Sequence, residues 1–87
     1  MTLQFQNHNL AKLTYDHDMI VLSEIDEEKR DAFVQLMQEA VSKLDYLHDI
    51  PYELSDEITQ LIVYNISLKD FSIFRQELIY MGFVLVP

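Results

Sequence analysis

The sequence has no cysteine, one glycine and few basic residues, and each scarcity removes a class of function. Without cysteine there are no disulfides, no thiolate nucleophile and no cysteine-ligated zinc. A single glycine, Gly82, leaves no glycine-rich loop of the kind that cradles phosphates. Six Lys and Arg face fifteen Asp and Glu, a formal net charge of −9, so direct binding of nucleic acid or of anionic membranes is not expected.

Long apolar runs are also missing. The longest runs contain four residues, as in Phe83–Val86, whereas a membrane-spanning helix needs about 20. The N-terminal segment MTLQFQNHNLAKL lacks the basic region followed by an apolar region that marks a signal peptide. We therefore expect a soluble, cytoplasmic protein.

Alternation of apolar and polar residues predicts three strands, over residues 2–6, 12–15 and 19–22. Segments 7–9 and 16–18 interrupt the alternation with Asn, Asp and His, residues that favour turns. The N-terminal third of the chain is thus expected to be an antiparallel meander with two polar tips.

A helix is predicted to begin after Asp26, a good N-cap, and to end at or before Ile50, because Pro51 follows. Glu27 and Glu28 fall in its first turn, where the helix dipole favours anions. Its apolar residues recur at spacings of three and four, and they are Phe33, Leu36, Met37, Ala40, Leu44 and Leu47.

Two more helices and a last strand are predicted downstream. Ser55 is expected to cap a second helix, whose apolar face consists of Ile58, Leu61, Ile62 and Ile66. Ser67 and Asp70 form an S-x-x-D cap for a third helix, whose inner face consists of Phe71, Phe74 and Leu78. Gly82 suits a left-handed C-cap, and Phe83–Val86 is expected to be a buried strand.

This order of elements predicts an α+β fold in a single domain over residues 1–87. Its parts are an N-terminal three-stranded antiparallel meander, three helices packed on one face, and a C-terminal strand returning to the sheet. A chain of this size buries only about 60–65% of its unfolded surface, yet 49% of its residues are apolar. Apolar surface left over is a reason to expect a partner.

The segment Asp16-His17-Asp18 poses the question of a metal or proton-transfer site. A metal site needs three or four converging ligands, and adjacent side chains of a strand point to opposite faces. His8 lies near the other predicted tip, and His48 lies near the end of the first predicted helix. A hairpin tip is the favoured interpretation, and we expect no metal or other cofactor.

No catalytic constellation stands out elsewhere. No serine lies in a G-x-S-x-G elbow. The carboxylate pairs Glu27/Glu28 and Asp56/Glu57 lie at predicted helix starts, where the helix dipole already accounts for them. Acid–base catalysis needs a carboxyl group removed from water, so the protein is not expected to be an enzyme.

The acids are concentrated in two stretches. Residues 13–28 contain six acids and residues 44–68 contain five, and neither stretch contains Lys or Arg. Each could be only a solvated face, but folded together they would form one acidic patch that docks on a basic protein surface. The candidate acidic contacts are Asp16, Asp18, Glu24, Glu27, Asp31, Asp45, Asp49, Glu53, Asp56 and Glu57.

Several apolar residues fall outside the predicted core faces. They could be buried between neighbouring helices, or they could form a patch for a partner or for a second copy in a homodimer. Tyrosine suits such a patch because it combines contact area with a polar hydroxyl. The candidate apolar contacts are Tyr52, Val63, Tyr64, Ile73 and Tyr80.

In size, acidity and single-domain organisation, the chain resembles the small inhibitors that phages and mobile elements encode, among them anti-CRISPR proteins. It is also similar in charge and size to toxin-neutralising immunity proteins. The segment FSIFRQELIYMGFVLV, residues 71–86, resembles the final helix and strand of barstar-like inhibitors over less than a quarter of the chain. These resemblances imply a phage or bacterial protein that binds and blocks a partner.

The expected function is therefore that of a non-enzymatic inhibitor docking on a basic, often nucleic-acid-binding, surface of another protein. One alternative is a toxin-neutralising immunity protein. Another is a structural or adaptor protein that self-associates through its exposed apolar residues.

Overall fold

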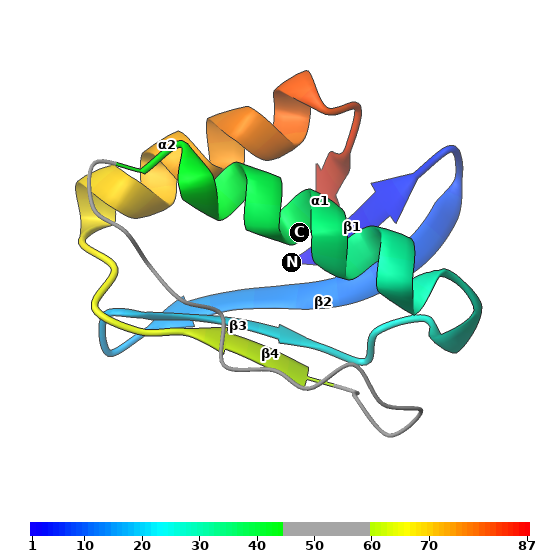
Figure 1. The fold of residues 1–87 in the computed structure, drawn as a ribbon, viewed down its shortest axis with the longest axis horizontal. Helices are drawn as coiled ribbons and strands as arrows, with labels where there is room; N and C mark the ends of the chain where they lie inside the picture. The colour runs from blue at the N-terminus through cyan, green and yellow to red at the C-terminus, as the bar shows by residue number, and fades with distance from the viewer. Residues whose placement is uncertain (45–59) are drawn as a thin grey trace.

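The computed structural model is a five-stranded antiparallel sheet with two helices on one face, and it describes residues 1–44 and 60–87 (Figure 1). The predicted α+β class is confirmed. The strands are β1 (Thr2–Phe5), β2 (His8–Asp16), β3 (Met19–Ser23), β4 (Gln60–Val63) and β5 (Val84–Val86). The helical elements are the 3-10 turn η1 (Glu27–Lys29), α1 (Arg30–Ser42) and α2 (Leu68–Tyr80).

The predicted meander is confirmed as β1, β2 and β3, which pair in antiparallel fashion. Its two turns contain two residues each, and all four residues have positive φ: Gln6 (51°), Asn7 (66°), His17 (51°) and Asp18 (58°). Two consecutive left-handed residues are typical of a type I′ turn, whose twist matches that of the flanking strands. The Asp16–Asp18 segment is thus the polar tip of a hairpin, as its turn chemistry indicated.

The first predicted helix is confirmed, with a shorter extent. Asp26 caps the 3-10 turn η1 that leads directly into α1, and its carboxylate accepts a hydrogen bond of 2.9 Å from the N–H of Glu28. The buried side is apolar, as the spacing predicted: Phe33, Val34, Met37, Ala40 and Val41. α1 ends at Ser42, eight residues before the predicted limit at Ile50.

The second predicted helix is wrong where the structure describes it, because residues 60–63 form strand β4. Leu61 and Val63 are fully buried, while Ile62 between them is only half-buried. This period of two is that of a strand. β4 pairs with β3 in register, Val21 opposite Ile62 and Leu22 opposite Leu61. The apolar run has only a weak local preference, because its pattern suits a helix or a strand. Pairing with the edge of β3 therefore decides that the run forms a strand.

The third predicted helix and the last strand are confirmed as α2 and β5. The hydroxyl of Ser67 accepts a hydrogen bond of 3.1 Å from the N–H of Asp70 and so caps the helix. Gly82 has φ of +101° and ends it, as expected for the one glycine. β5 returns to pair with β1, giving the order β4-β3-β2-β1-β5. It is an edge strand rather than a buried one, since Val84 is exposed.

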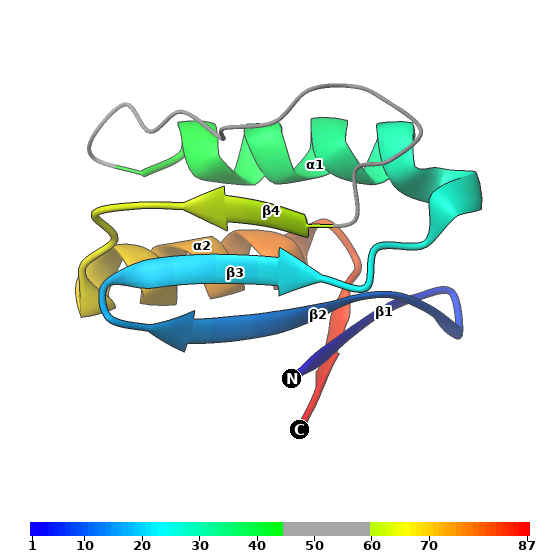
Figure 2. The same cartoon turned by 90° about the horizontal axis from the view of Figure 1, so that it is seen from below.

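The hydrophobic core lies between the sheet and the two helices, with Phe33, Phe74 and Leu78 among its fully buried side chains. Figure 2, seen from below, shows the strands with α2 behind them. Within residues 1–44 and 60–87, no helix or strand covers the opposite face of the sheet. Neither α1 nor α2 has the length and apolar character that a membrane crossing needs.

Candidate functional site

The face of the sheet opposite the two helices, which no helix or strand of residues 1–44 and 60–87 covers, carries a group of mostly apolar side chains. The registers place Thr14 opposite Val21 and Val21 opposite Ile62, in one row across β2, β3 and β4. Two residues before Val21 on β3, Met19 pairs with Asp16 of β2, and Tyr64 directly follows the end of β4. All five belong to the face opposite the core, because their strand neighbours, such as Leu13, Ile20 and Leu22, are fully buried.

We call these five residues the open-face cluster: Thr14, Met19, Val21, Ile62 and Tyr64. Met19, Val21 and Ile62 are half-buried, whereas Tyr64 is 49% exposed. A tyrosine in this position supplies a broad, rigid contact surface with a hydroxyl at its end. The cluster is therefore shaped as a protein contact rather than as an enclosed ligand pocket.

The acidic tip, defined as Asp16 and Asp18, adjoins the open-face cluster. Asp16 pairs with Met19 across the hairpin, so its side chain lies on the same face of the sheet as that of Met19. The side chain of Asp16 is 78% exposed, and Asp18 is exposed as well. Two solvated carboxylates thus stand at one end of an apolar contact surface, where they can meet cationic groups of a partner.

The acidic tip is held against the start of α2. The N–H of Ile66 donates to the carbonyl of Asp18 at 2.8 Å, and the hydroxyl of Tyr15 donates to the carbonyl of Ile66 at 2.5 Å. The Tyr15 ring also stacks on Phe71, with centroids 4.4 Å apart and planes 8° from parallel. These contacts fix the tip in the free protein, and an ordered surface loses less conformational entropy than a loose one whenever it binds.

The surroundings of Tyr15 raise the pKa of its hydroxyl above the ordinary value of 10.0. Its removal from water is the main cause, and the negative charges of Asp18 and Asp70 add to it. A phenol whose pKa is raised by folding stabilises the fold in its neutral form. That stability is complete below pH 10 and is lost as the pH rises through the higher folded pKa.

We therefore expect the free energy of unfolding to fall more steeply above pH 10 in the wild type than in Tyr15→Phe, which cannot ionise. Urea unfolding of both proteins between about pH 9 and pH 11 measures the difference in slope. The variant also lacks the hydrogen bond to Ile66, so its curve starts lower and only the slope is compared. Parallel curves would contradict the prediction.

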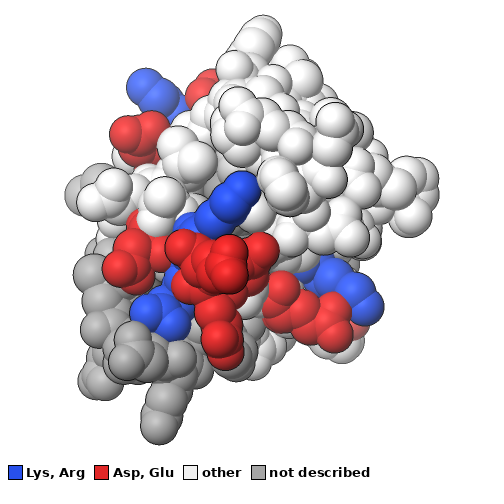
Figure 3. Space-filling model, turned by 90° about the vertical axis from the view of Figure 1, so that its right-hand side faces the viewer, with Lys and Arg blue, Asp and Glu red and all other residues white. Residues whose placement is uncertain are grey.

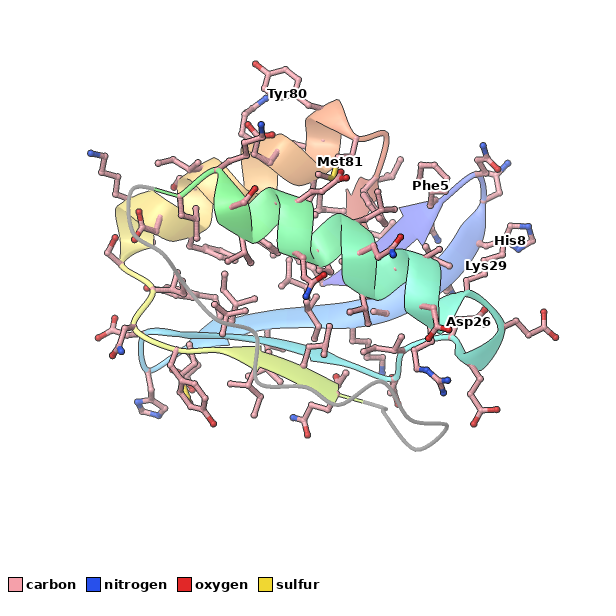
Figure 4. The ribbon with its side chains drawn as sticks, in the orientation of Figure 1. Phe5, His8, Asp26, Lys29, Tyr80 and Met81 are labelled. Carbon is pink, nitrogen blue, oxygen red and sulfur yellow. The ribbon has the colours of Figure 1, made fainter. Side chains whose placement is uncertain are left out.

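The remaining described acids of the predicted patch lie at the other end of β3, around η1. They are Glu24, Glu27 and Asp31, joined by Asp26 and Glu28. Basic residues lie among them, as Figure 3 shows and as the pairs Lys12–Glu24 (2.9 Å) and Arg30–Asp31 (3.5 Å) specify. In Figure 4, Lys29 and Asp26 stand together at this end. Residues 13–28 therefore form two separate acidic groups, not one.

Six predicted contact residues lie outside the described part of the chain: Asp45, Asp49, Tyr52, Glu53, Asp56 and Glu57. Among the other apolar candidates, Val63 is fully buried in the core and so offers no contact surface, whereas Ile73 is half-buried against the core. Tyr80 is 75% exposed at the end of α2, away from the open-face cluster (Figure 4). Sequence spacing did not single out Met19, Val21 and Ile62, because their shared face depends on strand pairing.

The histidines of the two hairpins do not converge. His8 begins β2 and His17 follows its other end, so the strand separates them. His17 Nε2 lies 3.4 Å from Asp16 Oδ2 on an open surface. Among residues 1–44 and 60–87, no three His, Asp or Glu residues are grouped for a metal ion.

An open hollow of about 260 Å³ on α2 is lined by Ser72, Arg75, Gln76 and Ile79. This lining has one cation and no carboxylate, so it offers neither an acid–base pair nor a set of metal ligands.

Comparison with known protein families, curated proteins and solved structures found no match. What the described residues offer for function is a surface: the open-face cluster on the sheet face opposite the helices, with the acidic tip beside it.

Proposed function

We propose that the protein is a non-enzymatic binding protein that docks the open-face cluster and the acidic tip on a basic surface of another protein. The observation that carries the proposal is the half-exposed ring of Tyr64, which follows the buried Val63 at the end of β4 and so belongs to the same face of the sheet as the paired residues Met19 and Asp16. Affinity at protein interfaces usually comes from a few buried aromatic anchors, while charges beside them steer association and select the partner.

Inhibition is the outcome this geometry favours, because a surface that covers basic side chains withholds them from phosphates. A protein of this kind would be an anti-defence inhibitor of the anti-CRISPR type, encoded by a phage or mobile element. A toxin-neutralising immunity protein would use the same contacts on a basic toxin. In both cases, the partner loses nucleic-acid binding or activity in proportion to the fraction of its molecules that this protein occupies.

Two double variants that remove equal charge test the proposal. Asp16→Asn with Asp18→Asn neutralises the acidic tip, and Glu27→Gln with Glu28→Gln neutralises two exposed acids at the other end of β3. Partners are captured at low salt from cells of the source, and their dissociation constants are measured by calorimetry. We expect the tip variant to bind about ten-fold more weakly, or 1.4 kcal/mol, and the η1 variant to bind as the wild type does.

Salt provides the second measurement. If the acidic tip steers association, the association rate of the wild type falls steeply as salt rises, and that of the tip variant falls less. Equal losses in both double variants, or a partner with no basic surface, would refute the proposed mode of binding.

A further inference from the structure

The outer edge of β5 is a second surface of the molecule, separate from the open-face cluster. β5 is the last strand in the order β4-β3-β2-β1-β5, and within the described residues it pairs with β1 alone. An edge strand presents backbone N–H and C=O groups to any chain that can pair with them. The direction of these groups follows from the register of β1.

The hydrogen bonds of β1 show which groups of β5 point outward. The Met1 amino group donates to the Leu13 carbonyl at 2.8 Å, and the Leu13 N–H donates to the Met1 carbonyl at 2.7 Å. Because facing pairs alternate along antiparallel strands, Thr2 turns its peptide groups to β5, and its partner Val86 turns its own to β1. Leu85 therefore directs its N–H and C=O away from β1, to the outer edge.

The chain that forms this edge has no charged side chain. Residues 1–11 and 78–87 contain no Asp, Glu, Lys or Arg, and they include the neighbouring strands β1 and β5. Figure 3 shows a wide area without charged side chains above and to the right of the charged groups. A basic partner gains no attraction from such a surface, whereas a second copy of this acidic chain meets no like charge there.

We propose that β5 pairs with β5 of a second copy, antiparallel about a two-fold axis at Leu85. The Leu85 N–H of each copy then donates to the Leu85 carbonyl of the other, and the two sheets become continuous. Val84, 57% exposed, comes to lie opposite Val86 of the second copy as a β-branched cross-strand pair.

The pairing is short. The N–H of Phe83 already donates to the carbonyl of Leu78 at 3.0 Å, and Pro87 has no N–H to donate. Two intermolecular hydrogen bonds and a few apolar side chains bury less than the ~800 Å² per partner of a standard interface. The dimer is therefore weak, with a dissociation constant of about 0.1–1 mM.

Amide hydrogen exchange by NMR tests the pairing at single residues. The amides of Val84 and Val86 face β1 and are protected at every concentration. The Leu85 amide is exposed in the monomer, so we expect its protection to rise when the protein is concentrated from about 0.05 to about 2 mM, on either side of the expected constant. A Leu85 amide whose exchange does not depend on concentration would overturn the proposal.

Sedimentation of two lysine variants supplies the matched control. Val84→Lys places a cation of each copy next to the two-fold axis, and Gln60→Lys makes the same charge change at an exposed position of β4, outside the open-face cluster. We expect the wild type and Gln60→Lys to dimerise with concentration and Val84→Lys to stay monomeric. Dimerisation of all three, or of none, would overturn the proposal. Neither result bears on partner binding through the open-face cluster, because β5 does not belong to it.

Discussion

Leu61→Ala is expected to lower the free energy of unfolding by about 2–5 kcal/mol, whereas Ile62→Ala lowers it by less than about 1 kcal/mol. Leu61 is fully buried opposite Leu22, and its truncation leaves a cavity between sheet and helices. Ile62 is half-buried on the open face, where water fills the space left by the missing carbons. Urea unfolding followed by circular dichroism measures both values.

Comparing the stabilities of Leu61→Ala and Ile62→Ala distinguishes a strand from a helix at residues 60–63. A helix with the face Ile58, Leu61, Ile62 and Ile66 would bury both side chains, and both truncations would then be costly. A domain of this size has a total stability of roughly 5–15 kcal/mol, so Leu61→Ala removes a large share of it. Equal losses at the two positions would contradict the assignment of β4.

Tyr64→Ala is expected to weaken partner binding by about 30-fold or more, equivalent to roughly 2 kcal/mol, the usual threshold of an interface hot spot. Tyr64 is the most exposed apolar side chain of the open-face cluster, and Met19 and Ile62 beside it exclude water when a partner covers them. Because it is 49% exposed in the free protein, its truncation should change the free energy of unfolding by less than about 1 kcal/mol.

Tyr80→Ala is the matched control for this prediction. It removes the same side chain from a site that is 75% exposed on α2, outside the open-face cluster. Calorimetry with the captured partner is expected to show wild-type affinity for Tyr80→Ala. If Tyr80→Ala weakens binding as much as Tyr64→Ala does, the contact surface lies on α2 and the open-face cluster is not the binding site.

Much of the fold could be predicted because its signals are local. The cap formed by Ser67 and Asp70 is contained within four residues, and Gly82 alone marks the end of α2. The turns of the meander likewise follow from residues that tolerate left-handed backbone, such as Asn7 and Asp18. Each of these features depends on a backbone conformation that is set by residues close together in the sequence.

The prediction of the second helix was wrong because its decisive contact is not local. The run Leu61–Tyr64 fits one face of a helix and also fits a strand. Only its pairing with β3, about forty residues earlier in the chain, chooses between them. The same pairing brings Met19, Val21 and Ile62 onto one face.

The distribution of charge likewise has one part that the sequence specifies and one part that the tertiary structure decides. Composition already specified a strongly acidic protein, and the spacing of residues 13–28 specified where the acids occur along the chain. An extended strand advances about 3.4 Å per residue, so the five residues of β3 carry the acidic tip roughly 17 Å away from Glu24 and η1.

Local sequence alone thus determined the meander, α1, α2 and the excess of negative charge. The tertiary structure decided which residues share a surface, because strand register and the side of the sheet that the helices cover depend on contacts between distant segments. Those contacts paired Ile62 with Val21, buried Val63, mixed Lys12 and Arg30 with the acids around η1, and left Leu85 at an uncharged edge.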